Sequence, residues 1–97
     1  MRPPENQKWL PMEYEFGFTD KDRDEAAATL RLAHIAVEGL FGEARSRLEV
    51  STRVTTNGGD LLVIDASSAP GEALCRIFLA FAAREFGADA FTVRPSL

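Results

Sequence analysis

Apolar and polar residues alternate on both sides of the segment Asn57-Gly58-Gly59, and this pattern predicts a β-hairpin in the middle of the chain. A loop of these three residues aligns the apolar positions of the two flanking strands and leaves one face of the hairpin apolar. A two-residue loop would shift the register by one residue and mix the two faces. The expected cross-strand pairs are Val50–Ala66, Thr52–Ile64, Val54–Leu62 and Thr56–Asp60.

The same period of two predicts a strand near each end of the chain. Aromatic and other apolar residues alternate with smaller or charged ones from Met12 to Phe18, which predicts a first strand with an aromatic inner face. Phe91 and Val93 mark the inner face of a last strand, which we expect Pro95 to end.

Helical periodicity predicts two helices. The first runs from about Lys21 to Glu43, with Thr19 or Asp20 as its cap. Its expected core stripe is Ala26, Leu30, Ala33, Val37, Leu40 and Ala44. The second helix has Pro70 in its first turn and ends at Gly87. Its expected apolar face is Leu74, Cys75, Phe78, Phe81, Ala82 and Phe86.

The element order strand, helix, strand, strand, helix, strand predicts an α+β sandwich. Right-handed crossovers favour the ferredoxin-like βαββαβ arrangement, in which two helices cover one face of a four-stranded antiparallel sheet. We expect residues 11–97 to form this single domain. Residues 1–8 are polar and rich in proline, so we expect residues 1–10 to form a flexible N-terminal tail.

The first helix carries a second apolar stripe opposite its core stripe. At about 100° per residue, this second stripe consists of Ala28, Leu32, Ile35 and Gly39. A surface helix with one buried face does not need Leu32 and Ile35 there, so the stripe predicts a protein interface. Two alternatives are scattered exposed residues and cover from the tail through Trp9 and Leu10.

The sheet face away from the helices is a second candidate surface. Its expected residues are Glu13, Glu15, Glu49, Ser51, Arg53, Thr55, Leu61, Val63, Asp65, Thr92 and Arg94. One hypothesis is a binding site in which arginines meet carboxylates of a ligand; the other is a solvated face with ordinary cross-strand ion pairs. The candidates for binding are Glu15, Arg53, Val63, Asp65 and Arg94.

The chain has one histidine and one cysteine. His34 could act as a base oriented by Glu38, but a surface histidine beside a helical neighbour explains it as well. Cys75 lies on an apolar helix face, which favours a buried structural thiol over a nucleophile. We expect no metal site, because no second histidine or cysteine completes a ligand set.

Charge and composition narrow the classes of function. The 97 residues include 11 basic and 15 acidic side chains, a net charge of −4, which disfavours nucleic acid and acidic membranes as partners. No membrane span or apolar signal segment is present in the sequence, so we expect a cytoplasmic location. We expect a non-enzymatic protein-interaction module without a cofactor, which homodimerises or docks on a larger protein. The alternative is a small-ligand-binding or enzymatic domain, with its site on the open sheet face at a subunit interface.

Overall fold

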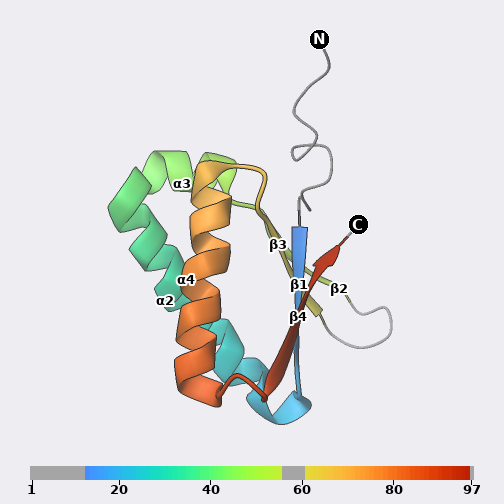
Figure 1. Ribbon diagram of the computed structural model, residues 1–97. Coiled ribbons are helices and arrows are strands. Elements are labelled where there is room, and N and C mark those ends of the chain that lie inside the picture. The colour runs from blue at the N-terminus through green and yellow to red at the C-terminus, as the bar shows by residue number, and fades with distance from the viewer. Residues whose placement is uncertain (1–12, 56–60, 97) are drawn as a thin grey trace.

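The computed structural model describes residues 13–55 and 61–96, which form four strands and three α-helices (Figure 1). The strands are β1 (Glu13–Phe18), β2 (Thr52–Thr55), β3 (Leu61–Asp65) and β4 (Phe91–Ser96). The helices are the 3₁₀ turn η1 (Asp20–Asp22) and the α-helices α2 (Arg23–Phe41), α3 (Glu43–Glu49) and α4 (Ala69–Phe86). Three expectations lie outside the described residues. They are the tail over residues 1–10 with its possible contact with the second stripe of the first helix, the three-residue hairpin loop, and the pair Thr56–Asp60.

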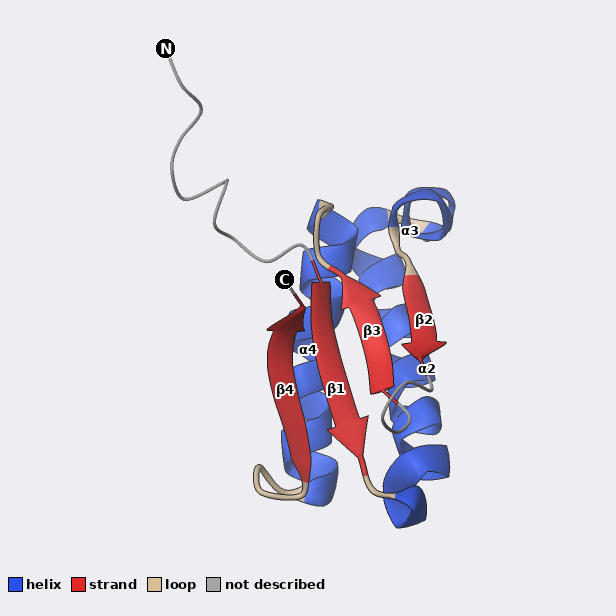
Figure 2. Ribbon diagram, turned by 90° about the vertical axis from the view of Figure 1, so that its right-hand side faces the viewer, coloured by secondary structure: helices blue, strands red, loops and turns tan. Residues whose placement is uncertain are grey.

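The strands form one antiparallel sheet in the order β2-β3-β1-β4. Both views of the ribbon place the helices on the same side of this sheet, with α2 and α4 side by side (Figures 1 and 2). The molecule is therefore an α+β domain with two layers, as the element pattern predicted.

The predicted hairpin register is confirmed where the structure describes it. Thr52 pairs with Ile64, and Val54 pairs with Leu62. The ladder starts at Thr52, so the expected pairing of Val50 with Ala66 lies beyond its end. Both of these residues instead pack, half-buried, against the core.

Aromatic side chains of β1 form the centre of the core, as the period of two predicted. Phe16 is 1% exposed, and its ring meets that of Phe78 edge-on at 5.0 Å between centroids. Phe18 stacks on Phe91 of β4 at 5.2 Å. Edge and offset contacts of this kind add to the energy of burying the rings. The buried cluster is Phe16, Ala33, Val37, Ile64, Leu74, Cys75 and Phe78.

The expected helix over residues 21–43 is wrong at both ends. It starts as the turn η1, in which Asp20 is the first residue, and the expected cap Thr19 makes no side-chain capping hydrogen bond. At the other end Gly42 has φ 87°, a conformation that favours glycine, and breaks the helix. The chain then forms α3, so three α-helices replace the expected two. Pairs of opposite charge one turn apart, Arg45–Glu49 at 3.0 Å and Arg47–Glu43 at 3.2 Å, favour this extra helix.

The break at Gly42 also corrects the predicted core stripe. Leu40 is 67% exposed and Ala44 is exposed, whereas Phe41 packs half-buried against the core. Ala26, Ala33 and Val37 are buried as expected. Glu49, which was expected on the open sheet face, lies in α3 instead.

The boundaries of α4 follow the predicted signals. Ser68 caps the helix, because its Oγ accepts a hydrogen bond from the Gly71 amide at 3.0 Å and donates one to the Glu49 carbonyl at 2.8 Å. The helix ends at Gly87 with φ 91°. The predicted end of the last strand is wrong, because Pro95 lies within β4. This is an edge strand, where proline is tolerated.

Candidate functional site

The outward face of α2 presents the predicted second stripe to solvent. Leu32 is 60% exposed and Ile35 is 64% exposed, while Ala28 and Gly39 are exposed beside them. Ala33 and Val37 on the opposite side are fully buried. The position of the stripe opposite the core is therefore confirmed, and its role as an interface stays a prediction. We call these four residues the α2 stripe.

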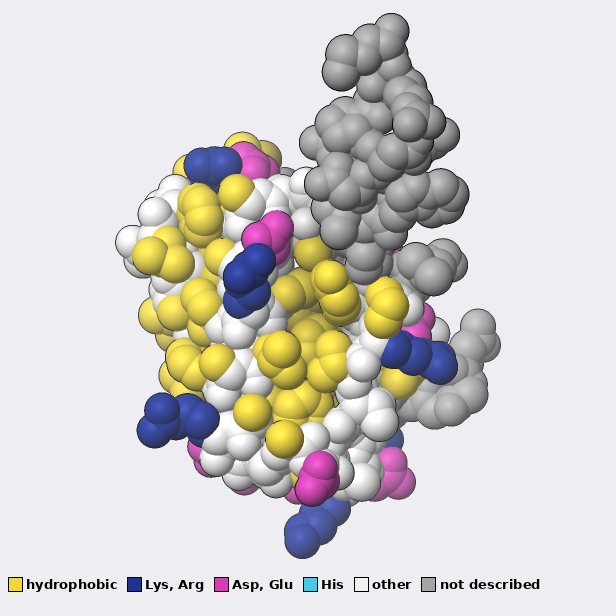
Figure 3. All heavy atoms as spheres, viewed as in Figure 1, with side chains coloured by type: hydrophobic (Ala, Val, Ile, Leu, Met, Phe, Trp, Pro, Cys, Tyr) yellow, Lys and Arg dark blue, Asp and Glu magenta, His cyan; other side chains and the backbone are white. Residues whose placement is uncertain are grey.

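A shallow groove of about 440 Å³ runs beside the α2 stripe, between α2 and α4. Ala28 and Leu32 form part of one wall, and Phe81 contributes an aromatic ring from α4. Apolar side chains spread over this helical layer, with a few charged groups among them (Figure 3). The helical layer thus has both an apolar ridge and a neighbouring hollow.

The open sheet face carries ion pairs within the chain. Strand pairing aligns Arg53, Val63, Glu15 and Arg94 in one row across the four strands. Arg94 donates a hydrogen bond to Glu15 at 2.7 Å, and Arg53 donates two to Glu13 at 2.5 and 3.1 Å. The hydrogen bonds from Arg53 lower the pKa of the Glu13 carboxyl below its ordinary value of 4.5. The geometry matches the cross-strand alternative, in which the arginines meet carboxylates of the same chain.

Val63 is only 1% exposed, although its register places it on this open face. The ion pair between Arg53 and Glu13 joins β2 to β1, which are not neighbours, so it must cross β3 between them. Val63 lies opposite Arg53 and Glu15 on β3, beneath that crossing. Asp65, the remaining candidate, accepts a hydrogen bond from the Ser67 amide at 2.8 Å and thereby shapes the turn before α4. The five open-face candidates thus lie together, but Glu15, Arg53, Asp65 and Arg94 bond to groups of the same chain and Val63 is buried.

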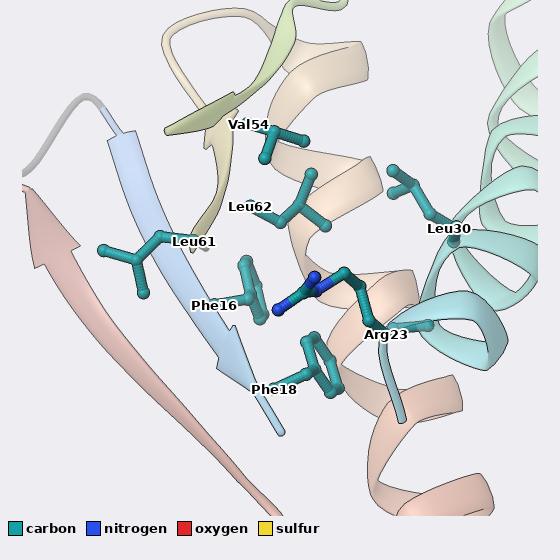
Figure 4. A pocket seen from close by; sticks show the side chains of 9 residues that line it. Phe16, Phe18, Arg23, Leu30, Val54, Leu61 and Leu62 are labelled. Atoms are coloured by element: carbon teal, nitrogen blue, oxygen red, sulfur yellow. The ribbon is translucent and has the colours of Figure 1, made fainter. Parts of the chain in front are cut away.

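An apolar pocket lies on the helix side of the sheet, where the sequence indicated no site. Its volume is about 150 Å³, and its walls come from β1, β2, β3 and α2. Phe16, Phe18, Val54, Leu62 and Leu30 lie around it, whereas Leu61 points away from them (Figure 4). The side chain of Arg23 extends toward the two phenylalanine rings (Figure 4). The pocket depends on how far α2 sits from β2, and no local sequence signal reports that separation.

Cys75 is a core residue, as its apolar neighbours predicted. It is 8% exposed, and its Sγ lies 4.0 Å from the carbonyl oxygen of Ile64. Burial raises the pKa of this thiol to about 12. A thiol with this pKa stays protonated at neutral pH, and the thiolate is the nucleophilic form.

We therefore expect Cys75 to react slowly with a thiol reagent in the native protein. Labelling at neutral pH should be at least about a hundredfold slower than in denatured protein, because both burial and the raised pKa oppose attack. The measurement is the rate of adduct formation by mass spectrometry with and without urea. Equal rates in the two conditions would show an accessible, reactive thiol.

His34 is partly buried on α2. Its burial lowers the pKa of the imidazole below the ordinary 6.5, and the charge of Glu38 opposes this shift. The fold therefore favours the neutral ring. The contribution of His34 to stability is complete above about pH 6.5 and falls as the pH drops below it.

Replacing His34 by alanine should change the free energy of unfolding by no more than about 0.5 kcal/mol at neutral pH. On acidification the wild type should lose stability relative to His34→Ala, because only the wild type must charge a partly buried ring. Urea unfolding at about pH 8 and about pH 5 measures this difference. A wild type that gains stability relative to the variant in acid would mean that Glu38 outweighs desolvation.

Within residues 13–55 and 61–96, no three His, Cys, Asp or Glu side chains gather in a way that could hold a metal ion. No helix in the same ranges is long and apolar enough to cross a membrane.

Comparison with protein-family models, with curated proteins and with solved structures found no match for this chain. The chemistry and geometry of the described surfaces are therefore the basis for a function.

Proposed function

We propose that this domain is a non-enzymatic protein-interaction module that binds another polypeptide through the α2 stripe. The observation that carries the proposal is the exposure of Leu32 and Ile35, at 60% and 64%, on a helix whose opposite face already fills the core. Fully burying a leucine or isoleucine side chain gains roughly 1.5–3 kcal/mol, and more than half of each of these side chains still lies in water. Contiguous exposed apolar patches, unlike apolar residues scattered singly, are typical of interaction surfaces.

The small members of the stripe add support. A Cβ built on Gly39 would meet no heavy atom within 4 Å, so the surface at this point is open. A helix with Ala28 and Gly39 on its outer face lets another backbone approach closely. The protonated, buried thiol of Cys75 supports a role other than nucleophilic catalysis.

The open sheet face is the weaker candidate for a binding site. Arg53 and Arg94 are hydrogen-bonded to Glu13 and Glu15, so a ligand carboxylate would have to displace these partners. The prediction of a small-ligand or enzymatic site there keeps no specific observation in its favour.

We also propose that the architecture is the ferredoxin-like sandwich, with α3 as an addition. Read from the β4 edge, the strand order is β4-β1-β3-β2. Helix α2 follows β1, and α4 connects β3 to β4. This order and these connections support the assignment, and shared architecture carries no function by itself.

The experiment uses a photoreactive amino acid at position 31, on the edge of the α2 stripe, in the cells that make the protein. Position 76, an exposed site on α4, is the control for random collisions. The adduct from position 31 should disappear in the variant Leu32→Glu/Ile35→Lys, which places charges in the stripe. It should persist in Leu48→Glu/Val54→Lys, which changes two other apolar residues that are 85% and 66% exposed.

The pattern of adducts decides the proposal. A protein adduct that forms from position 31 but not 76, and that only the α2 variant abolishes, supports it. Its absence from position 31, or its persistence in the α2 variant, overturns it. Circular dichroism of each purified variant establishes that the fold is retained.

A second candidate function, binding of a small apolar group, is favoured by the pocket beneath α2. Its lining is almost wholly apolar, and its volume of about 150 Å³ equals that of engineered cavities that stay dry and bind benzene. A drug-sized ligand needs a larger site of at least about 300 Å³. The fitting class is a ring or branched chain of about six carbon atoms.

Benzene is the probe for this second candidate. NMR shifts of the methyl groups of Leu30 and Leu62 should move on titration, and Leu30→Phe should abolish the response by filling the space. Leu79→Phe, on a surface of α4 outside the pocket, should leave it unchanged. Unmoved methyl shifts in the wild type would rule out the pocket as a binding site.

A further inference from the structure

We infer that the partner of the α2 stripe is a second copy of this chain. The two α2 helices pack antiparallel, stripe against stripe, about a two-fold axis that crosses them at the level midway between Ala33 and His34. The inference rests on the proposed function and names its partner. Three properties of the stripe lead to it: its symmetry in sequence, the leaning of its side chains, and the charges along one edge.

The stripe is symmetric about its own midpoint. Leu32 and Ile35 are equally far from the point between Ala33 and His34, and so are Ala28 and Gly39. In a two-fold interface each contact occurs twice, with the roles of the two residues exchanged. Antiparallel packing therefore sets Leu32 of one copy against Ile35 of the other, and Ala28 against Gly39.

The leaning of helical side chains makes this pairing fit in space. Side chains on a helix lean toward its N-terminus, so Leu32 covers the turn that contains Ala28. In the antiparallel pair, Gly39 of the second copy lies opposite that turn. Apart from the adjoining residues and the backbone of its own helix, no heavy atom lies within 4 Å of where its Cβ would be, so the leucine has room there. The spacing of four, three and four residues along the stripe is the one that packs as a helix pair.

Charge selects the antiparallel arrangement over the parallel one. Arg31 and Glu38 lie two turns apart along the same edge of the stripe. An antiparallel two-fold pair brings like edges together, so Arg31 of one copy meets Glu38 of the other, twice. A parallel pair brings opposite edges together and would set Arg31 beside Ala36. Only the antiparallel arrangement forms ion pairs between the copies at these positions.

The contact is small, which determines how the dimer behaves. Helix α2 has 19 residues and is about 28 Å long, so a contact through this helix alone falls in the size class of weak, transient interfaces. We expect a concentration-dependent equilibrium between monomer and dimer rather than a permanent dimer.

Engineered cysteines test the orientation. In the antiparallel pair, position 28 of one copy lies near position 39 of the other, whereas equivalent positions 28 are about 16 Å apart along the helix axis alone. A disulfide needs Cα atoms within about 7 Å. Ala28→Cys alone and Gly39→Cys alone should each form little disulfide-linked dimer under mild oxidation, and an equimolar mixture should form it at least about tenfold more readily. The buried Cys75 does not compete, since it is 8% exposed.

Charge reversal tests the same geometry without cysteines. By sedimentation velocity, Arg31→Glu and Glu38→Arg should each weaken self-association by roughly tenfold, because each puts like charges at two contacts. Mixing the two variants should restore wild-type association, because both contacts again join opposite charges. Association of the single variants that equals that of the wild type would overturn this arrangement.

The outcomes separate this inference from the proposed function. Covalent homodimers of each cysteine variant alone would exclude the antiparallel pair. A wild type that stays monomeric at all concentrations would exclude self-association. If a photoadduct from position 31 then has a mass other than twice that of the chain, the interaction module stands and its partner is a different protein.

Discussion

Gly71→Ala is expected to destabilise the protein by about 3 kcal/mol, the upper part of the range for overpacked cores. Gly71 is buried in the first turn of α4. A Cβ at this position would lie 2.2 Å from the carbonyl oxygen of Asp65 and 3.0 Å from the Oγ of Ser68. The first of these contacts is to the backbone, which cannot rotate away as a side chain can. The start of α4 would have to move, and the Ser68 cap would loosen.

The matched control is Gly39→Ala, the same chemical change on α2. Apart from the adjoining residues and the backbone of its own helix, no heavy atom lies within 4 Å of its added Cβ, so only the helical preference of alanine acts. We expect a gain of roughly 0.5–1 kcal/mol. Urea unfolding of both variants, followed by far-ultraviolet circular dichroism in dilute solution, measures the opposite signs. Equal unfolding midpoints for Gly71→Ala and the wild type would mean that β3 and α4 are less closely packed than described.

Phe78→Ala is expected to cost about 3–5 kcal/mol, as for other large aromatic residues removed from a core. The side chain is 0% exposed, and its ring contacts those of Phe16 at 5.0 Å and Phe18 at 5.9 Å between centroids. Removing it leaves a cavity between α4 and β1 that the rigid strand cannot close. A small domain has a total stability of about 5–15 kcal/mol, so this loss is a large fraction of the whole.

The neighbouring residue Leu79 provides the control for this second prediction. It lies on the same helix but is 41% exposed, so Leu79→Ala should cost only about 1 kcal/mol. Denaturant unfolding of the two variants, with the slope checked for two-state behaviour, gives the comparison. Similar losses for both variants would contradict the position of Phe78 at the centre of the core.

The hairpin and the aromatic strand could be predicted because their signal is local. Side chains alternate along a strand with a period of two, so only one register keeps Val54 and Leu62 on the same face as Thr52 and Ile64. The boundaries of α4 were equally predictable. Ser68 and Gly87 act on the backbone within a turn of where they stand in the sequence. The exposed stripe of α2 followed from the angle between its residues alone.

Helix α3 is absent from the predicted elements, although the sequence contains a local signal for it. Gly42 followed by Glu43, Arg45, Arg47 and Glu49, with opposite charges one turn apart, is typical of a short helix after a break. The alternation of polar and apolar residues around Val50 has the period of a strand, and it predicts that the strand starts earlier than it does. The result moved Glu49 from the sheet to a helix and left Leu40 exposed.

The sequence by itself determined the order of the four strands and of the two long helices, the register of the hairpin and the outward face of α2, because each depends on the periodicity of residues close in the chain. The tertiary structure alone decided which groups meet across the fold. Arg53 and Glu13 are 40 positions apart and meet only because the sheet places their strands on the two sides of β3. Their ion pair crosses β3, and Val63 beneath it is buried on a face that periodicity assigns to solvent. The pocket beneath α2 likewise depends on the distance between a helix and a sheet edge. Such distances are set by the packing of the whole core, and no single segment of the sequence encodes them.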